Sequence, residues 1–216
     1  MKTQDLTITS KDKSQAVIIW LHGLGANGKD LASILPYLSL NKADNITHIF
    51  PNAPTQAVTI NAGMAMPSWY DIIAISTTRD INPQQFSQSV TRIQDLISTQ
   101  INNGIKSENI FLIGFSQGGA VAYHSGLTYN KPLGAVLALS TYIAEDLVIN
   151  PANAKLPIHI FHGTSDDVVP IDLAHSARAT LEQHQIKPSF TSYPMAHEIC
   201  PPQINDMAKL INQHLS

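Results

Sequence analysis

The chain has 216 residues, of which 44% are hydrophobic and 13% are charged, and its formal net charge at pH 7 is -3. This composition excludes a disordered protein and suits a chain that buries a full apolar core. Lysine and arginine are scattered rather than gathered in runs, so nothing supports nucleic-acid binding. The single cysteine, Cys200, excludes an intrachain disulfide and is typical of a reducing compartment.

No segment predicts export or membrane insertion. The polar stretch before residue 16 lacks the apolar core of a signal peptide. The longest apolar run, 16–21, is too short to cross a bilayer. We therefore expect a cytoplasmic protein.

Short apolar runs alternate with segments of helical periodicity along the chain. Strands alternating with helices predict a mostly parallel sheet with helices on both faces, and we expect residues 1–216 to form one α/β domain. One segment, 51–81, interrupts the alternation with three prolines and only a weak strand signal at 58–60. In chain order, the predicted elements are strand 16–21, helix 29–40, strand 46–50, a helix from Pro83 that ends before Gly104, strand 109–113, helix 117–127, strand 135–139, strand 158–161, helix 171–184, strand 190–193 and helix 202–214.

The sharpest motif is Gly114-Phe115-Ser116-Gln117-Gly118, a G-x-S-x-G sequence. It follows a predicted strand and opens a predicted helix, as the nucleophile elbow of an α/β-hydrolase fold requires. A serine on such a strained turn is exposed, and the glycines let neighbouring backbone approach closely. The alternative is a plain glycine-rich turn. The motif predicts Ser116 as a nucleophile.

A nucleophilic serine needs a base oriented by an acid, and in this fold the acid follows the serine in the chain and precedes the histidine. Asp166 comes just after strand 158–161, at the end of the sheet where functional groups gather. Asp167 and Asp146 are rival candidates for the acid. Either rival could instead be a solvated or helix-capping carboxylate.

Four histidines follow Asp166 in the chain. His197 lies in a loop after strand 190–193, where it could reach the serine. It is therefore the predicted base, and its alternative role is to cap the last helix. The other three, His175, His184 and His214, fall within helical patterns and are expected on helix surfaces.

The loop after the first strand, His22-Gly23-Leu24-Gly25, is placed to supply one N–H of an oxyanion hole. The residue after the nucleophile supplies the other. We therefore choose the backbone N–H groups of Leu24 and Gln117. His22 is expected to shape the loop by hydrogen bonding.

Two other kinds of site are weakly supported. Residues 23–28 fit the dinucleotide fingerprint G-x-G-x-x-G, but the second strand ends in Phe50 and Pro51 rather than in a ribose-binding acid. His197-Glu198 lacks the second histidine of a zinc motif, so we predict no metal. Cys200 is expected to be a small packing residue.

A set of short motifs spans nearly the whole chain: His22-Gly23-Leu24-Gly25, Pro51-Asn52-Ala53-Pro54, Met66-Pro67-Ser68-Trp69-Tyr70-Asp71, Gly114-Phe115-Ser116-Gln117-Gly118-Gly119, His162-Gly163 with Asp166 and Val169-Pro170, and His197-Glu198-Ile199-Cys200. In these motifs the chain resembles the phospholipase/carboxylesterase family, which includes acyl-protein thioesterases and lysophospholipase-like carboxylesterases. The resemblance implies an esterase, and also a thioesterase, with Ser116, Asp166 and His197 as triad and no cofactor. The chain departs from the family pattern where Thr164 replaces a common Asp, Asp167 a common Pro, and Ala26-Asn27 an Asp-Thr or Asp-Ser pair.

The segment 61–77 carries more apolar side chains than a solvent loop should expose, among them Met64, Met66 and Trp69. We predict an acyl-binding flap in which Met66 and Trp69 contact the substrate, and which touches membrane or micelle surfaces when open. The alternative is that the segment packs on the core. Expected substrates are small acyl esters or thioesters, lipids or acylated proteins.

Two further expectations follow from this interpretation. The family resemblance implies homodimer formation. A catalytically silent hydrolase fold that serves as a binding module is the main alternative function, and the intact Ser116, Asp166 and His197 argue against it.

Overall fold

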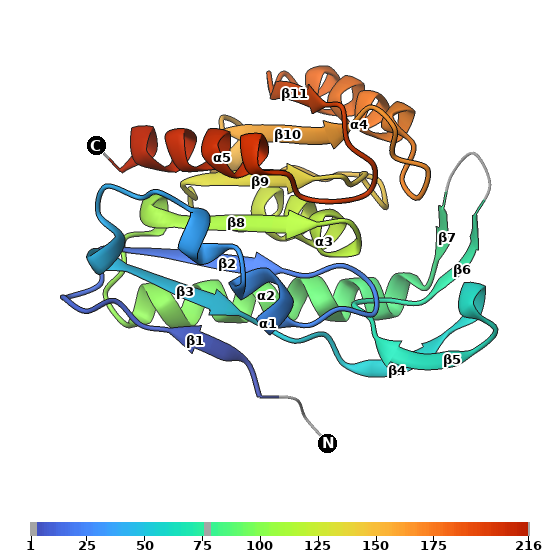
Figure 1. Cartoon of the computed structure of the whole chain (residues 1–216), viewed down its shortest axis with the longest axis horizontal. Coiled ribbons are helices and arrows are strands. Elements are labelled where there is room, and N and C mark those ends of the chain that lie inside the picture. Colours follow the sequence, from blue (N-terminus) through green and yellow to red (C-terminus); the bar gives the residue numbers. More distant parts are fainter. Residues whose placement is uncertain (1–3, 76–78, 216) are drawn as a thin grey trace.

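The computed structural model describes residues 4–75 and 79–215, and its main feature is a central sheet (Figure 1). Within these residues, seven strands follow the order β1-β3-β2-β8-β9-β10-β11. All neighbours are parallel except β1, which runs antiparallel to β3. The strands are β1 (Leu6–Ile8), β2 (Ala16–Leu21), β3 (Ile46–Phe50), β8 (Ile110–Phe115), β9 (Ala135–Leu139), β10 (Ile158–Gly163) and β11 (Ser189–Tyr193).

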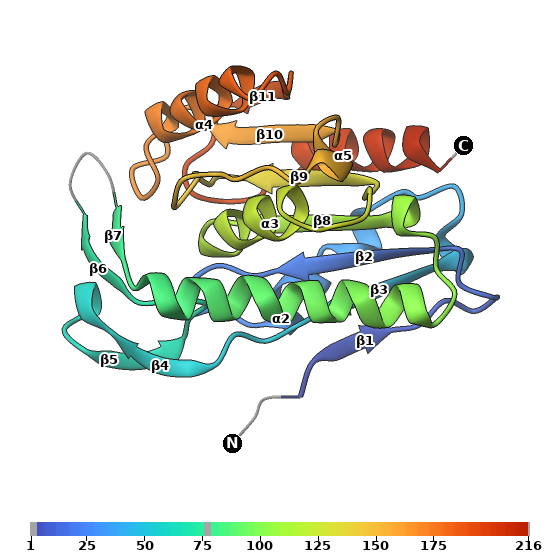
Figure 2. The same ribbon diagram turned by 180° about the vertical axis from the view of Figure 1, so that it is seen from behind.

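Helices cover both faces of this sheet (Figures 1 and 2). One face packs against α2 (Pro83–Asn102), α3 (Gln117–Leu127) and α4 (Ile171–Gln183), and the other packs against α1 (Gly28–Ala32) and α5 (Pro201–His214). The predicted layers are therefore confirmed. Short 3-10 helices lie at Leu35–Tyr37, Ala43–Asn45, Thr59–Asn61, Ser107–Asn109 and Pro151–Asn153.

The central strands read as continuous apolar runs because both of their faces are buried. In β2, Val17 and Ile19 pack on the side of α2 and α3, whereas Ile18 and Trp20 pack on the side of α5. Alternate side chains of one strand point to opposite faces, so a single run supplies both cores. No helix in the described part of the chain is long and apolar enough to span a membrane.

Most predicted elements match the structure, and one helix does not. The predicted helix 29–40 is wrong: α1 ends at Ala32, and a separate 3-10 turn follows at Leu35–Tyr37. Pro36 explains the difference, because in a continuous α-helix its ring would clash with the carbonyl of Ala32, four residues before it, and it has no N–H to donate to that carbonyl. The weak strand signal at 58–60 instead spans the end of a strand and a 3-10 turn.

The irregular segment 51–81 forms two hairpins beyond the carboxyl ends of the central strands (Figure 1). The first pairs β4 (Thr55–Val58) with β5 (Met64–Pro67), and the second pairs β6 (Ile72–Ile75) with β7 (Arg79–Ile81). The proposed flap covers residues 61–77, of which 76 and 77 lie outside the described residues.

The apolar side chains of this segment divide into two groups. Met64 is 65% exposed and Ile75 is 57% exposed, as an acyl-binding surface requires. Trp69 is only 1% exposed, and Ile72 is buried as well. Trp69 therefore follows the alternative given for this segment, since its indole packs into the core beside the sheet. The segment is in part a surface and in part a layer of the core.

Candidate active site

Ser116 stands on a strained turn between β8 and α3. Its φ of 53° and ψ of -121° are rare for a residue with a side chain. Gly118 permits this turn, since a Cβ there would lie 2.6 Å from the carbonyl oxygen of His22. The Ser116 N–H donates to the carbonyl of Leu139 at 2.9 Å, and the Thr141 hydroxyl donates to the Ser116 carbonyl at 2.6 Å. The sheet and the β9 loop thus hold the turn from both sides.

Asp166 lies in the turn after β10 and is only 7% exposed. One carboxylate oxygen, Oδ1, accepts the backbone N–H groups of Val168 at 3.0 Å and Val169 at 2.8 Å. The other, Oδ2, accepts Nδ1–H of His197 at 2.7 Å. A carboxylate can only accept here, so the His197 proton sits on Nδ1 and Nε2 is free to act as a base.

The two rival acids lie elsewhere. Asp167 and Asp146 are both exposed, and the hydrogen bond from His197 goes to neither. A second histidine, His162, also lies close to Asp166. Its Nε2 donates to the carbonyl of Val169 at 2.7 Å and lies 3.5 Å from Asp166 Oδ2. Burial lowers the pKa of the His162 imidazole, so this ring stays neutral beside the acid.

His197 occupies the loop between β11 and α5. Its ring packs against Phe115, the residue before Ser116, with the two ring centroids 4.7 Å apart. The structure therefore brings the predicted base to the elbow, although 81 positions separate His197 from Ser116 in the sequence. The other three candidate histidines lie away from this pair: His175 stacks on Phe190, and His184 and His214 sit at the ends of α4 and α5.

The loop after β2 lies directly against the elbow. A Cβ placed on Gly23 would be 3.4 Å from Ser116 Cβ. Within residues 4–75 and 79–215, the backbone N–H groups of Leu24 and Gln117 donate no hydrogen bond. Gln117 is also the first residue of α3, where the helix dipole favours negative charge. Two free donors beside a serine are what an oxyanion hole requires.

His22 shapes this loop, as expected. Its Nε2 accepts the N–H of Ala53 at 3.0 Å, and its Nδ1 lies 2.7 Å from the carbonyl of Gly23. The ring is fully buried, and this burial lowers its pKa. A neutral imidazole with both nitrogens engaged cannot serve as a base for Ser116.

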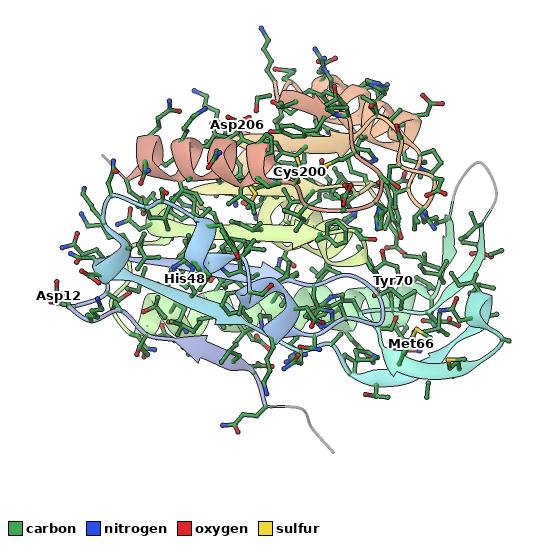
Figure 3. All side chains as sticks on the ribbon, in the orientation of Figure 1. Asp12, His48, Met66, Tyr70, Cys200 and Asp206 are labelled. Atoms are coloured by element: carbon green, nitrogen blue, oxygen red, sulfur yellow. The ribbon has the colours of Figure 1, made fainter. Side chains whose placement is uncertain are left out.

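The two predicted substrate contacts lie in different environments. Met66 is half-buried on β5 (Figure 3). Its sulfur would be 3.7 Å from a Cβ on Gly25, so it borders the Leu24 loop. Trp69 lies beneath that loop and donates its indole N–H to the carbonyl of His22 at 2.8 Å. Sequence reasoning missed this role, because it treated Trp69 as a wall for acyl chains.

Across the described ranges, no group of three or more His, Cys, Asp or Glu side chains could hold a metal ion.

The glycine-rich loop at 23–28, which fits the dinucleotide fingerprint in sequence, leads into the capped start of α1. Asn27 caps α1 by accepting the N–H of Lys29 at 2.9 Å, while the Asp30 side chain accepts the N–H of Asn27.

Fold and site together define a hydrolase of the α/β-hydrolase fold. The family model described as Phospholipase/Carboxylesterase matches residues 3–215, and the chain belongs to this family. It is an enzyme of the serine hydrolase class. Among curated relatives, acyl-protein thioesterase 1 of Saccharomyces cerevisiae is 34% identical over 94% of this chain and 94% of its own length. Acyl-protein thioesterase 1 of Neurospora crassa is 33% identical over 97% of this chain and 91% of its own length.

Solved structures share this fold. Arabidopsis thaliana SOBER1 has a TM-score of 0.89 and 29% identity, and the match covers 93% of this chain and 99% of that one. Zea mays acyl-protein thioesterase 2 has a TM-score of 0.84 over 99% of each chain. Its identity of 24% makes it evidence for the fold alone.

Cys200→Ala is expected to keep wild-type turnover within about twofold. The thiol is half-buried at the start of α5 and packs against the apolar core on that face of the sheet. The measurement is ester turnover together with the thermal unfolding midpoint. A loss of turnover without a loss of thermal stability would instead assign the thiol a chemical role.

Proposed function

We propose that the protein hydrolyses carboxylic esters and thioesters through an acyl-serine intermediate. The observation that carries the proposal is the 2.7 Å hydrogen bond between His197 and Asp166, beside the strained turn at Ser116. In the first step, His197 Nε2 takes the hydroxyl proton while Ser116 Oγ attacks the acyl carbon. The N–H groups of Leu24 and Gln117 stabilise the oxyanion that forms.

The tetrahedral intermediate then collapses to the acyl-enzyme, which water hydrolyses. The protonated His197 gives its proton to the leaving alkoxide or thiolate, and the acyl group stays on Ser116. Water attacks this ester with His197 again as base, the protonated His197 returns the proton to Ser116 Oγ, and the acid product leaves. Asp166 stabilises the imidazolium in both steps. The sequence of steps needs no metal and no cofactor.

The surroundings of the site and the relatives support a substrate class. The curated relatives are named acyl-protein thioesterases, which supports an acylated protein as substrate. Exposed apolar side chains on the hairpins, Met64, Ile73 and Ile75, suit a long acyl chain or a lipid. Contact of the flap with a membrane surface, homodimer formation and a cytoplasmic location stay predictions.

A fluorophosphonate probe tests the proposal directly. We expect covalent labelling of the purified protein at Ser116 and turnover of both ester and thioester substrates. A panel that varies acyl length then ranks the substrates. A silent hydrolase fold would give neither labelling nor turnover, and labelling at another residue would contradict the assignment of Ser116.

Met66→Ala is expected to lower kcat/KM for medium-chain esters up to about tenfold and to leave acetate esters unchanged. The reason is that only a longer chain reaches the β5 side chain beside the Leu24 loop. The kinetics of both substrates on one folded variant give the measurement. Val148→Ala, an exposed apolar side chain outside the hairpins, is the control. An equal loss for both substrates would exclude Met66 as an acyl contact.

A further inference from the structure

The segment Pro67–Tyr70, which links the two hairpins, is bound to the nucleophile elbow. The Gln117 side chain provides the link: its Nε2 donates to the carbonyl of Tyr70 at 2.6 Å and to the hydroxyl of Ser68 at 3.0 Å. Its Oε1 accepts the backbone N–H of Trp69 at 2.9 Å. All these side chains are buried. Each hydrogen of the amide and its oxygen therefore have a partner, which fixes the side chain in one orientation.

The same segment is bound to the loop after β2. The indole N–H of Trp69 donates to the carbonyl of His22 at 2.8 Å, and the two ring centroids lie 5.3 Å apart. On the other side of Leu24, the N–H of Gly25 donates to the carbonyl of Pro67 at 2.8 Å. The peptide that carries the Leu24 N–H is thus fixed at the residues before and after it.

We propose that Ser68 and Trp69, with the Gln117 amide, are positioning residues that set the two oxyanion donors relative to each other. We call Pro67–Tyr70 the oxyanion clamp. It is bound to the Leu24 loop on one side and to Gln117 on the other. The inference rests on the proposed function, in which Leu24 and Gln117 stabilise the oxyanion.

The clamp is expected to act on kcat rather than on KM. Full negative charge on the substrate oxygen exists only in and near the transition state, so donor placement affects that state more than substrate binding. Loss of a whole oxyanion donor costs about 10²- to 10³-fold in kcat. A displaced donor still stabilises the charge in part, so a broken clamp should cost about tenfold.

The chain offers a matched pair of tryptophans to test this. Trp69→Phe removes the indole N–H to His22, while Trp20→Phe removes an equally buried indole N–H that donates to His48 at 3.1 Å. Trp20 packs on the opposite face of the sheet, in the α5 core. Both variants replace a buried indole with a smaller phenyl ring and lose one hydrogen bond, so both should unfold at a lower temperature. Only Trp69→Phe should lower kcat, by about tenfold, with KM within about twofold.

An inhibitor separates positioning from general destabilisation. An alkyl trifluoromethyl ketone adds to the serine hydroxyl and gives a tetrahedral hemiketal whose oxygen occupies the oxyanion hole. Its affinity should fall in Trp69→Phe by the same factor as kcat, and it should not change in Trp20→Phe. Equal losses in the two variants, or a change in KM alone, would overturn the clamp.

If Trp69→Phe does not fold, a pair of smaller substitutions tests the clamp. Ser68→Ala removes the hydroxyl that joins Gln117 to Tyr70, whereas Ser125→Ala removes a buried hydroxyl with no partner in the described structure. Only Ser68→Ala should lower kcat and inhibitor affinity together. If both serine variants keep wild-type kcat while the wild type is labelled at Ser116, the clamp is wrong and the proposed function stands. If wild-type Ser116 is not labelled, the proposed function itself is wrong.

Discussion

Ser116→Ala is expected to lower ester turnover by about 10⁴-fold or more and to leave folding nearly unchanged. Without the hydroxyl oxygen, no acyl-enzyme can form, and the residual rate comes only from substrate binding and the oxyanion donors. The strained backbone at this position stays, because alanine keeps the Cβ that the turn already accommodates. Steady-state kinetics on a soluble ester give the measurement.

Thermal unfolding of the same sample is the control. The elbow depends on hydrogen bonds of the Ser116 backbone, namely from its N–H to the Leu139 carbonyl and to its carbonyl from the Thr141 hydroxyl, and an alanine at position 116 retains both. The unfolding midpoint should therefore stay close to that of the wild type. A folded variant that keeps more than about a tenth of the wild-type turnover would reject Ser116 as the nucleophile.

The parallel strands of the central sheet could be predicted from the sequence, because burial on both faces produces continuous apolar runs. The short and mostly exposed edge strand β1 lacks such a run, and it was missed. Residues 16–21 and 46–50 are apolar-rich runs of strand length, and the structure has strands with the same bounds. The nucleophile elbow could also be predicted from the sequence, since glycines 114 and 118 stand where neighbouring backbone leaves no room for a Cβ. Local sterics and burial determine these features.

The hairpins and the clamp could not be predicted, because long-range contacts determine them. β5 contains Met64 and Pro67, neither of which signals a strand, and it exists because β4 pairs with it. The Trp69 side chain looks the same in sequence whether it faces solvent or the core. Its burial depends on two partners distant in the chain, His22 and Gln117. The motif placed the Gln117 backbone at the elbow but said nothing of its side chain.

The acid of the triad could be predicted only in part from the sequence. Sequence order and strand ends placed Asp166 and Asp167 at the right position, but two adjacent residues cannot be ranked by spacing alone. Their side chains point in different directions in the turn after β10. Asp166 turns inward, where the N–H groups of Val168 and Val169 meet one oxygen, and Asp167 turns outward to solvent. The geometry of one tight turn therefore favours Asp166.

Asp166→Asn is expected to cost about 10⁴-fold in kcat, and Asp167→Asn no more than a few-fold. The backbone N–H groups of Val168 and Val169 donate to Oδ1, so the asparagine carbonyl must take that position. Its NH₂ group then faces His197 Nδ1, where Asp166 Oδ2 accepts a proton in the wild type. Nδ1 has to become an acceptor, which moves the imidazole proton to Nε2.

A histidine in that tautomer cannot take the proton from Ser116. The loss of activity should therefore appear in kcat, while the amount of folded protein stays the same. Asp167→Asn is the matched control, because it makes the same chemical change one residue away on an exposed side chain. Kinetics and thermal unfolding of the two variants, measured side by side, decide the assignment. Equal losses, or a larger loss in Asp167→Asn, would mean that Asp166 is not the residue that orients His197. The hydrogen bond between them would then be structural, and another carboxylate would have to stabilise the imidazolium.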